Sequence, residues 1–278
     1  MMQSIDIGTA FSYNNNITQK RTGNHMIKVQ RHNEILKLLE QQDAMQISAL
    51  AELLQCSMMT VHRDIEELEQ QSLVRKVHGG VVLQRNDDLQ PSFNRRVVQN
   101  TEEKRRIAAE ALKMIEPGSS VFFDAGTTPL YLTKIIPANL AFTAITNSLQ
   151  TAVELAGKPN ITVIILAGEI HHSSYSAVNN LAIESASKFH TDLAIISTKS
   201  ISLPGGIYET SLPLIEIKNA MVRNTKKVVL LADHSKFNES AMCLAVGFED
   251  IDVVITDTGT PEDKVKKLRE LGVEVKVV

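Results

Sequence analysis

The segment QISALAELLQCSMMTVHRDIEELEQ, residues 46–70, decides the fold of the first part of the chain. Apolar residues recur at helical spacing in two runs, residues 48–54 and 60–68, and the short turn Gln55-Cys56-Ser57 separates them. Two helices joined by such a turn are typical of a helix-turn-helix, whose second helix enters the major groove of DNA. We predict this unit from about Met45 to Asp64.

The second helix of this unit, which we call the recognition helix, has one apolar stripe. At 100° per residue, Val61, Ile65 and Leu68 share that stripe and Arg63 points furthest from it. Ser48 and Ser57 are predicted to cap the two helices, because a serine hydroxyl accepts from an unpaired backbone N–H group. The alternative for a lone helix of this kind is a solvated amphipathic surface. DNA contacts are expected from the residues around its N-terminus: Ser57, Met59, Thr60, His62 and Arg63.

The next segment, LVRKVHGGVVL at residues 73–83, predicts a β-hairpin, because two β-rich runs flank a Gly-Gly turn. A helix-turn-helix followed by a hairpin is a winged helix. Arg75, Lys76 and His78 lie where the wing would contact backbone phosphates. A further helix, which carries Ile35, Leu38 and Leu39 on one face, is expected within residues 26–40.

Residues 30–81 resemble the DNA-binding domain of the DeoR family of bacterial transcription regulators, from Gln30-Arg31-His32-Asn33-Glu34-Ile35 to Val74-Arg75-Lys76-Val77-His78-Gly79-Gly80-Val81. The family's recognition helix usually has the sequence Thr-Ile-Arg-Arg-Asp-Leu, and here it is Thr60-Val61-His62-Arg63-Asp64-Ile65. His62 stands where the family usually has an arginine, whose guanidinium group is always charged. The resemblance therefore implies DNA binding but does not give the operator sequence.

Charge restricts how this domain can bind DNA. The whole chain has a net charge of -3. Residues 26–90 hold seven Lys or Arg and ten Asp or Glu, so their net charge is also 7 − 10 = -3. Bulk attraction to phosphates is therefore excluded as the main source of affinity. We expect a few well-placed cations, and a dimer or tetramer that presents several copies of the domain.

Composition favours a reduced, cytoplasmic protein. The two cysteines, Cys56 and Cys243, are far apart in the sequence, and no apolar run is long enough to span a bilayer. Residues 1–13 lack the basic and apolar regions of a signal peptide. Residues 1–25 are predicted to be a disordered leader, and Met26 is an alternative start of translation.

From Val121 onward, strands and helices alternate, which predicts a doubly wound, mostly parallel α/β domain. Strands are expected at residues 121–123, 141–145, 161–166, 193–196, 228–231, 253–256 and 273–278, with helices at 129–136, 149–156, 180–189, 214–222 and 262–271. The predicted domains are the leader 1–25, the winged helix-turn-helix 26–84, a linker 85–100 and an effector-sensing domain 101–278. The charge run at residues 102–106 predicts a solvated helix face; the alternative is a relay between domains.

Three polar loops follow strands of this domain, where ligands of open α/β sheets bind. They are Asp124-Ala125-Gly126-Thr127-Thr128, Thr146-Asn147-Ser148 and Asp233-His234-Ser235-Lys236-Phe237. The first offers N–H groups and hydroxyls to an anion at a helix N-terminus, although each of the first two loops is also explained by helix capping. Lys236 adds a point charge or is a solvated surface lysine. The candidate effector residues are Asp124, Gly126, Thr127, Thr128, Thr146, Asn147, Ser148 and Lys236.

These loops resemble the effector-domain motifs of the DeoR family, so the resemblance extends from Gln30 to about Asp257. It implies a fold similar to ribose-phosphate isomerases, a phosphate held by residues 126–128 and neutralised by Lys236, and a phosphorylated sugar or related metabolite as effector. The chain departs from the family at Gly168-Glu169, where a glycine pair is usual, and at residues 197–200, where a glycine-containing turn is usual. Side chains there narrow or reshape the pocket.

We therefore expect a transcription regulator, a repressor of a sugar or carbohydrate operon that a phosphorylated metabolite releases from DNA. The alternative is an isomerase-like enzyme fused to a DNA-binding domain, with Asp124, Glu169 or Asp233 as its base. A nucleotide-binding domain ranks last, since no glycine-rich signature is present. No catalytic residues and no cofactor are predicted. No metal site is predicted either, because the adjacent residues His171 and His172 would point to opposite sides of an extended segment.

Overall fold

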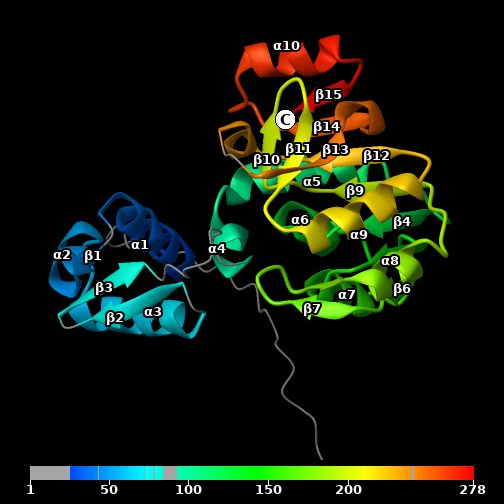
Figure 1. Cartoon of the computed structure of the whole chain (residues 1–278). Coiled ribbons are helices and arrows are strands. Elements are labelled where there is room, and N and C mark those ends of the chain that lie inside the picture. The colour runs from blue at the N-terminus through cyan, green and yellow to red at the C-terminus, as the bar shows by residue number, and fades with distance from the viewer. Residues whose placement is uncertain (1–25, 43, 72, 78, 84–92, 239–240) are drawn as a thin grey trace, which may run out of the picture.

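The computed structural model describes residues 26–42, 44–71, 73–77, 79–83, 93–238 and 241–278. The predicted leader and His78 lie outside these residues. Figure 1 shows a small N-terminal unit beside a larger α/β unit, with the short helix α4 (Phe93–Val98) between them. None of the helices described is both long and apolar enough to cross a membrane.

The N-terminal unit is a winged helix, as predicted. It contains α1 (Lys28–Gln42), β1 (Ala44–Gln46), α2 (Ile47–Leu53), α3 (Met58–Gln70), β2 (Val74–Val77) and β3 (Gly80–Leu83). The hairpin β2–β3 turns through Gly79 at φ 76°, a left-handed conformation that glycine adopts without steric cost. Strand β1 adds antiparallel to β3 and was not predicted, because three residues are too few to show a period.

The N-terminus of α2 differs from the prediction, because Gln46 is its N-cap and Ser48 lies inside the first turn. Ile47 is buried in the core of the unit, and the chain leaves β1 directly into the helix. The predicted serine cap on α2 is therefore wrong. The cap on α3 is confirmed, since the backbone N–H of Thr60 donates to Ser57 Oγ at 3.1 Å.

The range 85–100, predicted as a linker, contains α4, and residues 84–92 are outside the described part of the chain. Helix α5 (Thr101–Leu112) follows at once. Between them, Asn100 has a left-handed backbone with φ 49°. The two helices are thus joined by a single tight turn.

The α/β unit is built on a parallel sheet of seven strands in the order β15-β14-β12-β9-β4-β5-β6. The strands are β4 (Ser120–Phe123), β5 (Phe142–Thr146), β6 (Ile161–Ile165), β9 (Leu193–Ile196), β12 (Val228–Leu231), β14 (Val253–Thr256) and β15 (Glu274–Val277). Its helices, besides α5, are α6 (Thr127–Ile135), α7 (Leu149–Ala156), α8 (Asn180–Ala186), α9 (Leu212–Arg223) and α10 (Glu262–Glu270). The predicted doubly wound fold is confirmed. The chain reverses its direction of growth between β4 and β9, so a ligand crevice is expected there.

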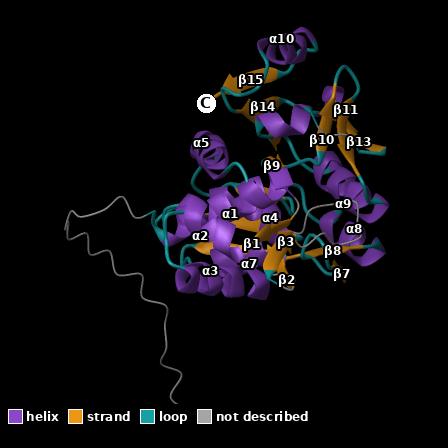
Figure 2. Cartoon of the chain, turned by 90° about the vertical axis from the view of Figure 1, so that its left-hand side faces the viewer, coloured by secondary structure: helices purple, strands orange, loops and turns teal. Residues whose placement is uncertain are grey.

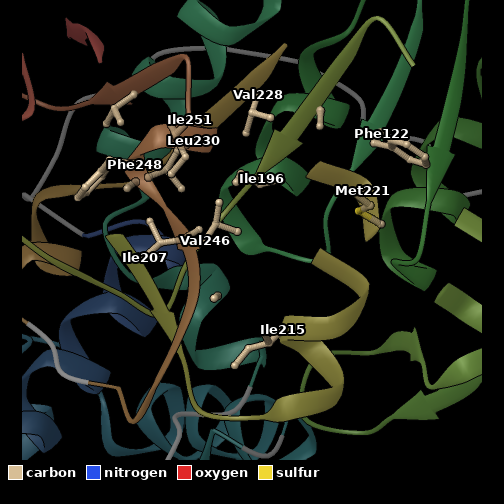
Figure 3. Close-up of a cluster of buried hydrophobic side chains, with 14 of the residues drawn as sticks. Phe122, Ile196, Ile207, Ile215, Met221, Val228, Leu230, Val246, Phe248 and Ile251 are labelled. Carbon is tan, nitrogen blue, oxygen red and sulfur yellow. The ribbon is translucent and has the colours of Figure 1, made fainter. Parts of the chain in front are cut away.

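Both faces of the sheet are buried, which explains why its strands are continuous apolar runs. Phe123 and Ile195 belong to a core cluster with residues of α5, α6 and α7. Phe122 and Ile196 point to the other face, into a cluster with residues of α8, α9 and α10 (Figure 3).

Two smaller sheets were not predicted. The hairpin β7 (Glu169–His171) and β8 (Ser176–Val178) follows β6, and β10 (Ser200–Ser202), β11 (Gly206–Glu209) and β13 (Cys243–Gly247) form an antiparallel sheet. Ile207 and Val246 of the latter join the same apolar cluster as Phe122 (Figure 3). In the turned view of Figure 2, β10, β11 and β13 lie together beside the main sheet.

Candidate functional site

The recognition helix α3 has one solvent-facing side that carries most of the predicted DNA contacts. Met59 is 77% exposed, and His62 and Arg63 are also exposed. Thr60 is half-buried, and its hydroxyl shares a 2.8 Å hydrogen bond with that of Ser57. The structure thus brings these five residues together at the N-terminal half of α3, which is where a helix-turn-helix contacts base edges.

Asp64 fastens the recognition helix to α1. Its side chain is 2% exposed and accepts two hydrogen bonds from Arg31, from Nε at 2.7 Å and from Nη2 at 2.9 Å. His32 Nε2 lies 3.1 Å from Asp64 Oδ1. The hydrogen bond to Asp64 raises the pKa of Arg31, although burial opposes the shift. Arg31 is therefore a structural partner of the helix that carries Arg63.

On the wing, Arg75 is exposed on β2. Lys76 is committed to acidic residues of α3, since its Nζ lies 3.1 Å from Glu66 Oε1 and 3.9 Å from Glu69 Oε2. Its backbone N–H also donates to Glu69 Oε1 at 2.8 Å. A DNA phosphate would have to compete with these carboxylates for Lys76.

The loops after β4, β9 and β12 meet at the predicted crevice and enclose a cavity. It is lined by Arg96, Gln99, Asn100, Lys104, Gly126, Thr127, Thr128, Ser197, Thr198, Lys199, Leu231, Asp233, Ser235 and Lys236. Four of the eight predicted effector residues are among them: Gly126, Thr127, Thr128 and Lys236. Gly126 is the N-cap of α6, so the N–H groups at the start of that helix lie at the cavity.

The cavity lining is predominantly cationic, with Arg96, Lys104, Lys199 and Lys236 against the single carboxylate of Asp233. Burial lowers the pKa of Lys104 to about 8, with Lys236 and Arg96 acting in the same direction and Asp233 opposing them. Burial on its own would raise the pKa of Asp233, but Lys236, Ser235, Lys104 and Asn100 together lower it. The cavity is thus suited to an anion.

Asp124 belongs to a buried ionic cluster with Lys218 and Glu209, none of which lines the cavity. Lys218 of α9, 2% exposed, contacts Asp124 Oδ2, lies 3.6 Å from Glu209 Oε1, and donates to the Ser197 carbonyl at 2.7 Å. Burial would lower the pKa of Lys218, but the two carboxylates outweigh it and raise that pKa. Burial raises the pKa of Glu209. Asp124, a predicted effector residue, is therefore bonded to Lys218 and Ser197 and is not among the residues that line the cavity.

The loops after β4 and β9 touch directly. The N–H and hydroxyl of Ser197 donate to Asp124 Oδ2 at 3.0 and 3.1 Å. A Cβ placed on Gly126 would lie 2.0 Å from Ser197 Oγ. Ser197, the first residue of the segment where the family usually has a glycine-containing turn, thus fills the space beside Gly126 and joins the cavity wall.

The third predicted loop, Thr146-Asn147-Ser148, does not line the cavity. The Thr146 hydroxyl donates to the Phe123 carbonyl at 2.7 Å, and Ser148 caps α7 by accepting from the Thr151 N–H. Asn147 Nδ2 donates to the Ala177 carbonyl at 3.2 Å, while its buried Oδ1 has no partner among the described atoms. Capping and attachment of β8 account for most of their polar atoms.

Sequence reasoning missed the buried charges. Lys104 shares an apolar helical stripe with Ile107, Ala108 and Ala111, and Lys218 lies among apolar residues of α9. A charge on an apolar stripe indicates a buried partner, and that signal was available. The charge run at 102–106 was predicted as solvated, which is wrong for Lys104 because it closes the turn before α5.

Comparisons with known proteins agree for both units. Residues 31–86 match the DeoR-like helix-turn-helix domain, and residues 99–258 match the DeoR C terminal sensor domain. The transcriptional regulator GolR of Listeria innocua is 32% identical over 91% of this chain and 99% of its own length. The glycerol-3-phosphate regulon repressor of Escherichia coli is 30% identical over 91% of this chain and 100% of its own length.

Among solved structures, ribose 5-phosphate isomerase A from Methanocaldococcus jannaschii is 16% identical, with a TM-score of 0.38 over 50% of this chain and 55% of that one. A likeness so distant carries no argument about function. The two domain matches and the relatives that align with nearly the whole chain do carry one. The chain belongs to the DeoR family of DNA-binding transcription regulators.

Proposed function

We propose that this regulator is a cytoplasmic repressor of a carbohydrate operon, which binds operator DNA as a dimer or tetramer and is released by a phosphorylated sugar or related metabolite. The observation that carries the proposal is the cationic cavity at the ends of β4, β9 and β12, next to a winged helix. A relative that aligns with this chain over its whole length is named for the glycerol-3-phosphate regulon, and another relative is named for the aga operon.

In this proposal the phosphate binds at the start of α6, where Gly126, Thr127 and Thr128 line the cavity. A helix N-terminus favours an anion through its unpaired donors and its dipole. Lys236 and Lys104 would neutralise the bound charge. We propose Asp124 as a support of this site, because it accepts from Lys218 and Ser197.

A thermal-shift screen tests the effector class. Sugar phosphates and glycerol 3-phosphate are compared with the same compounds without phosphate, since a ligand that binds only the folded protein raises its apparent stability. We expect a phosphorylated compound to raise the unfolding midpoint and its unphosphorylated counterpart to leave it unchanged. Equal shifts for both members of a pair would remove the phosphate from the proposal.

We propose sensing rather than turnover for the α/β unit. Asp124 is paired with Lys218, Asp233 accepts from Asn100 and Ser235, and Glu169 lies on β7 and is not among the cavity residues. An isomerase assay on aldose and ketose phosphates separates the two functions. Turnover that disappears in a Lys236→Ala variant would favour the enzyme.

Replacing Arg63 by alanine is expected to weaken operator binding by about 1–3 kcal/mol, because an exposed arginine on the recognition helix loses its DNA contact. The measurement is a gel-shift titration with a duplex selected from a random library by the wild-type chain. Arg106→Ala is the matched control, since Arg106 is an exposed arginine on α5. If both variants bind alike and are folded, Arg63 does not contact the operator.

Replacing Lys236 by alanine is expected to leave operator binding intact and to raise the effector concentration needed for release. Loss of a charged hydrogen bond costs about 1.5–3 kcal/mol, or about 10- to 150-fold in concentration. Lys266→Ala, an exposed lysine on α10, is the control. An unchanged response of the Lys236 variant would place the effector elsewhere.

A further inference from the structure

Residues 94–104, which we call the α4–α5 turn, border two cavities at once. Four residues of the turn line the effector cavity: Arg96, Gln99, Asn100 and Lys104. A second crevice separates the turn from α1 and is lined by Asn33, Leu36, Lys37, Arg95, Val98, Gln99 and Asn100. Gln99 and Asn100 therefore face both spaces. Figure 1 shows α4 between α1 and the α/β unit.

On the sensor side, the turn is held by the charged groups of the cavity. Asn100 Nδ2 donates to Asp233 Oδ1 at 2.9 Å, and the Lys104 ammonium donates to the carbonyl oxygens of Arg96 and Gln99. The Tyr131 hydroxyl donates to the Val97 carbonyl at 3.0 Å. Two of these anchors, Asp233 and Lys104, are charges that a bound anion would meet.

On the DNA side, the same turn is attached to the winged helix. Val98 packs against the apolar core that α1, α2 and α3 share. Asn94 Nδ2 donates to the carbonyl oxygen of Gln71, which is the C-cap of the recognition helix, at 3.0 Å. The turn thus contacts the effector cavity at one end and the recognition helix at the other.

We propose that the α4–α5 turn completes the effector cavity and carries its occupancy to the recognition helix; the proposal rests on the effector function proposed above. An anion in the cavity attracts the Lys104 ammonium and repels the Asp233 carboxylate. Both groups hold the turn, so binding favours an arrangement in which Lys104 donates to the ligand in place of the carbonyl oxygens of Arg96 and Gln99, and Asn100 leaves Asp233. Such differential affinity is what a ligand needs to shift an equilibrium between two states.

Two asparagine variants of the full chain test the relay, one on each side of it. The probes are inorganic phosphate and glycerol 3-phosphate, and the DNA is the selected duplex described above. Asn94→Ala removes the bond to Gln71 outside both cavities. We expect it to bind probe and duplex as the wild type does, while the probe-induced drop in duplex affinity, typically about 5- to 150-fold for coupled sites, falls below about 2-fold. Asn160→Ala, which removes a similar bond to the Ala138 carbonyl, is expected to keep the full drop.

Asn100→Gly cuts the bond to Asp233 and keeps the left-handed backbone, because glycine tolerates φ 49°. We expect it to bind the duplex, without probe, as weakly as the wild type does with saturating probe. Asn179→Gly is its control, since Asn179 also has a positive φ, of 79°, caps α8, and lines neither cavity. Wild-type duplex affinity in Asn100→Gly, or a full response in Asn94→Ala, would overturn the relay.

The two proposals fail in different ways. If the wild-type chain binds the duplex but neither probe changes its affinity, the proposed effector class is wrong. The comparison of Asn100→Gly with Asn179→Gly needs no probe and still decides whether the turn controls DNA binding. If the wild type responds and both turn variants respond equally well, the effector class stands and the relay is wrong.

Discussion

Replacing Lys218 by methionine is expected to destabilise the sensor domain by about 3–5 kcal/mol, the cost of removing one partner from a buried ion pair. Lys218 is the cation between Asp124 and Glu209, and all three side chains are buried. Methionine fills a similar volume but leaves two carboxylates facing each other without a counter-charge. Urea unfolding of the full chain, followed by far-ultraviolet circular dichroism, measures the loss in the transition of the α/β unit.

The variant should recover as the pH falls, because protonation of either carboxylate removes the repulsion. Combining Lys218→Met with Asp124→Asn and Glu209→Gln should restore part of the stability at neutral pH for the same reason. Lys266→Met, on the exposed surface of α10, is expected to change stability by less than about 0.5 kcal/mol. A loss below about 1 kcal/mol for Lys218→Met would show that the cluster is not a stabilising ion network.

Replacing Asp64 by asparagine is expected to destabilise the winged helix by about 3–5 kcal/mol and to abolish operator binding with it. The asparagine keeps the size of the side chain but loses the charge that accepts two hydrogen bonds from Arg31. Arg31, whose side chain is 15% exposed, is then left without its counter-charge, and α3 loses its attachment to α1. Hydrogen exchange of α1 and α3 in the full chain, together with the gel shift, measures both effects.

Glu66→Gln is the matched control on the same helix. Glu66 is exposed and pairs with Lys76, so its loss should cost about 1 kcal/mol or less. Asp64→Leu combined with Arg31→Met should recover much of the stability, because apolar residues of similar size often replace a buried ion pair without loss. If the amide hydrogens of α1 and α3 exchange as slowly in Asp64→Asn as in Glu66→Gln, the pair of Asp64 and Arg31 does not hold the recognition helix against α1.

The main helices and strands could be predicted from the sequence, because apolar residues recur at helical spacing in the helices and form short continuous runs in the buried strands. Apolar runs such as Val228–Leu231 appear between helices only when both faces of a sheet are covered, and every predicted strand of the parallel sheet is present. The small strands were not accessible. Strands β1, β7, β8 and β10 are three residues long each, and pairing with distant segments, rather than their own composition, makes them strands.

The candidate site was accessible only in part. Gly126, Thr127, Thr128 and Lys236 follow strands directly, so the rule for strand ends located them. Asn100 and Lys104 come from a turn that precedes the sheet, and only the packing of α4 and α5 brings them to the cavity. Strand β4 pairs with β9 and not with β6, and this pairing decides which loops share the cavity. Local sequence patterns do not reveal the order of the strands in a sheet.

The contact between Gly126 and Ser197 has a practical consequence for redirecting this sensor to a new ligand. The space for a side chain at position 126 is taken by the Ser197 hydroxyl, which is also bonded to Asp124. A library that randomises residues 124–128 alone would consist largely of clashing sequences, and one that randomises residues 197–200 alone would discard a donor to Asp124. The two loops therefore have to be varied together. A library that randomises both loops at once should yield far more folded sensors than the two single-loop libraries combined.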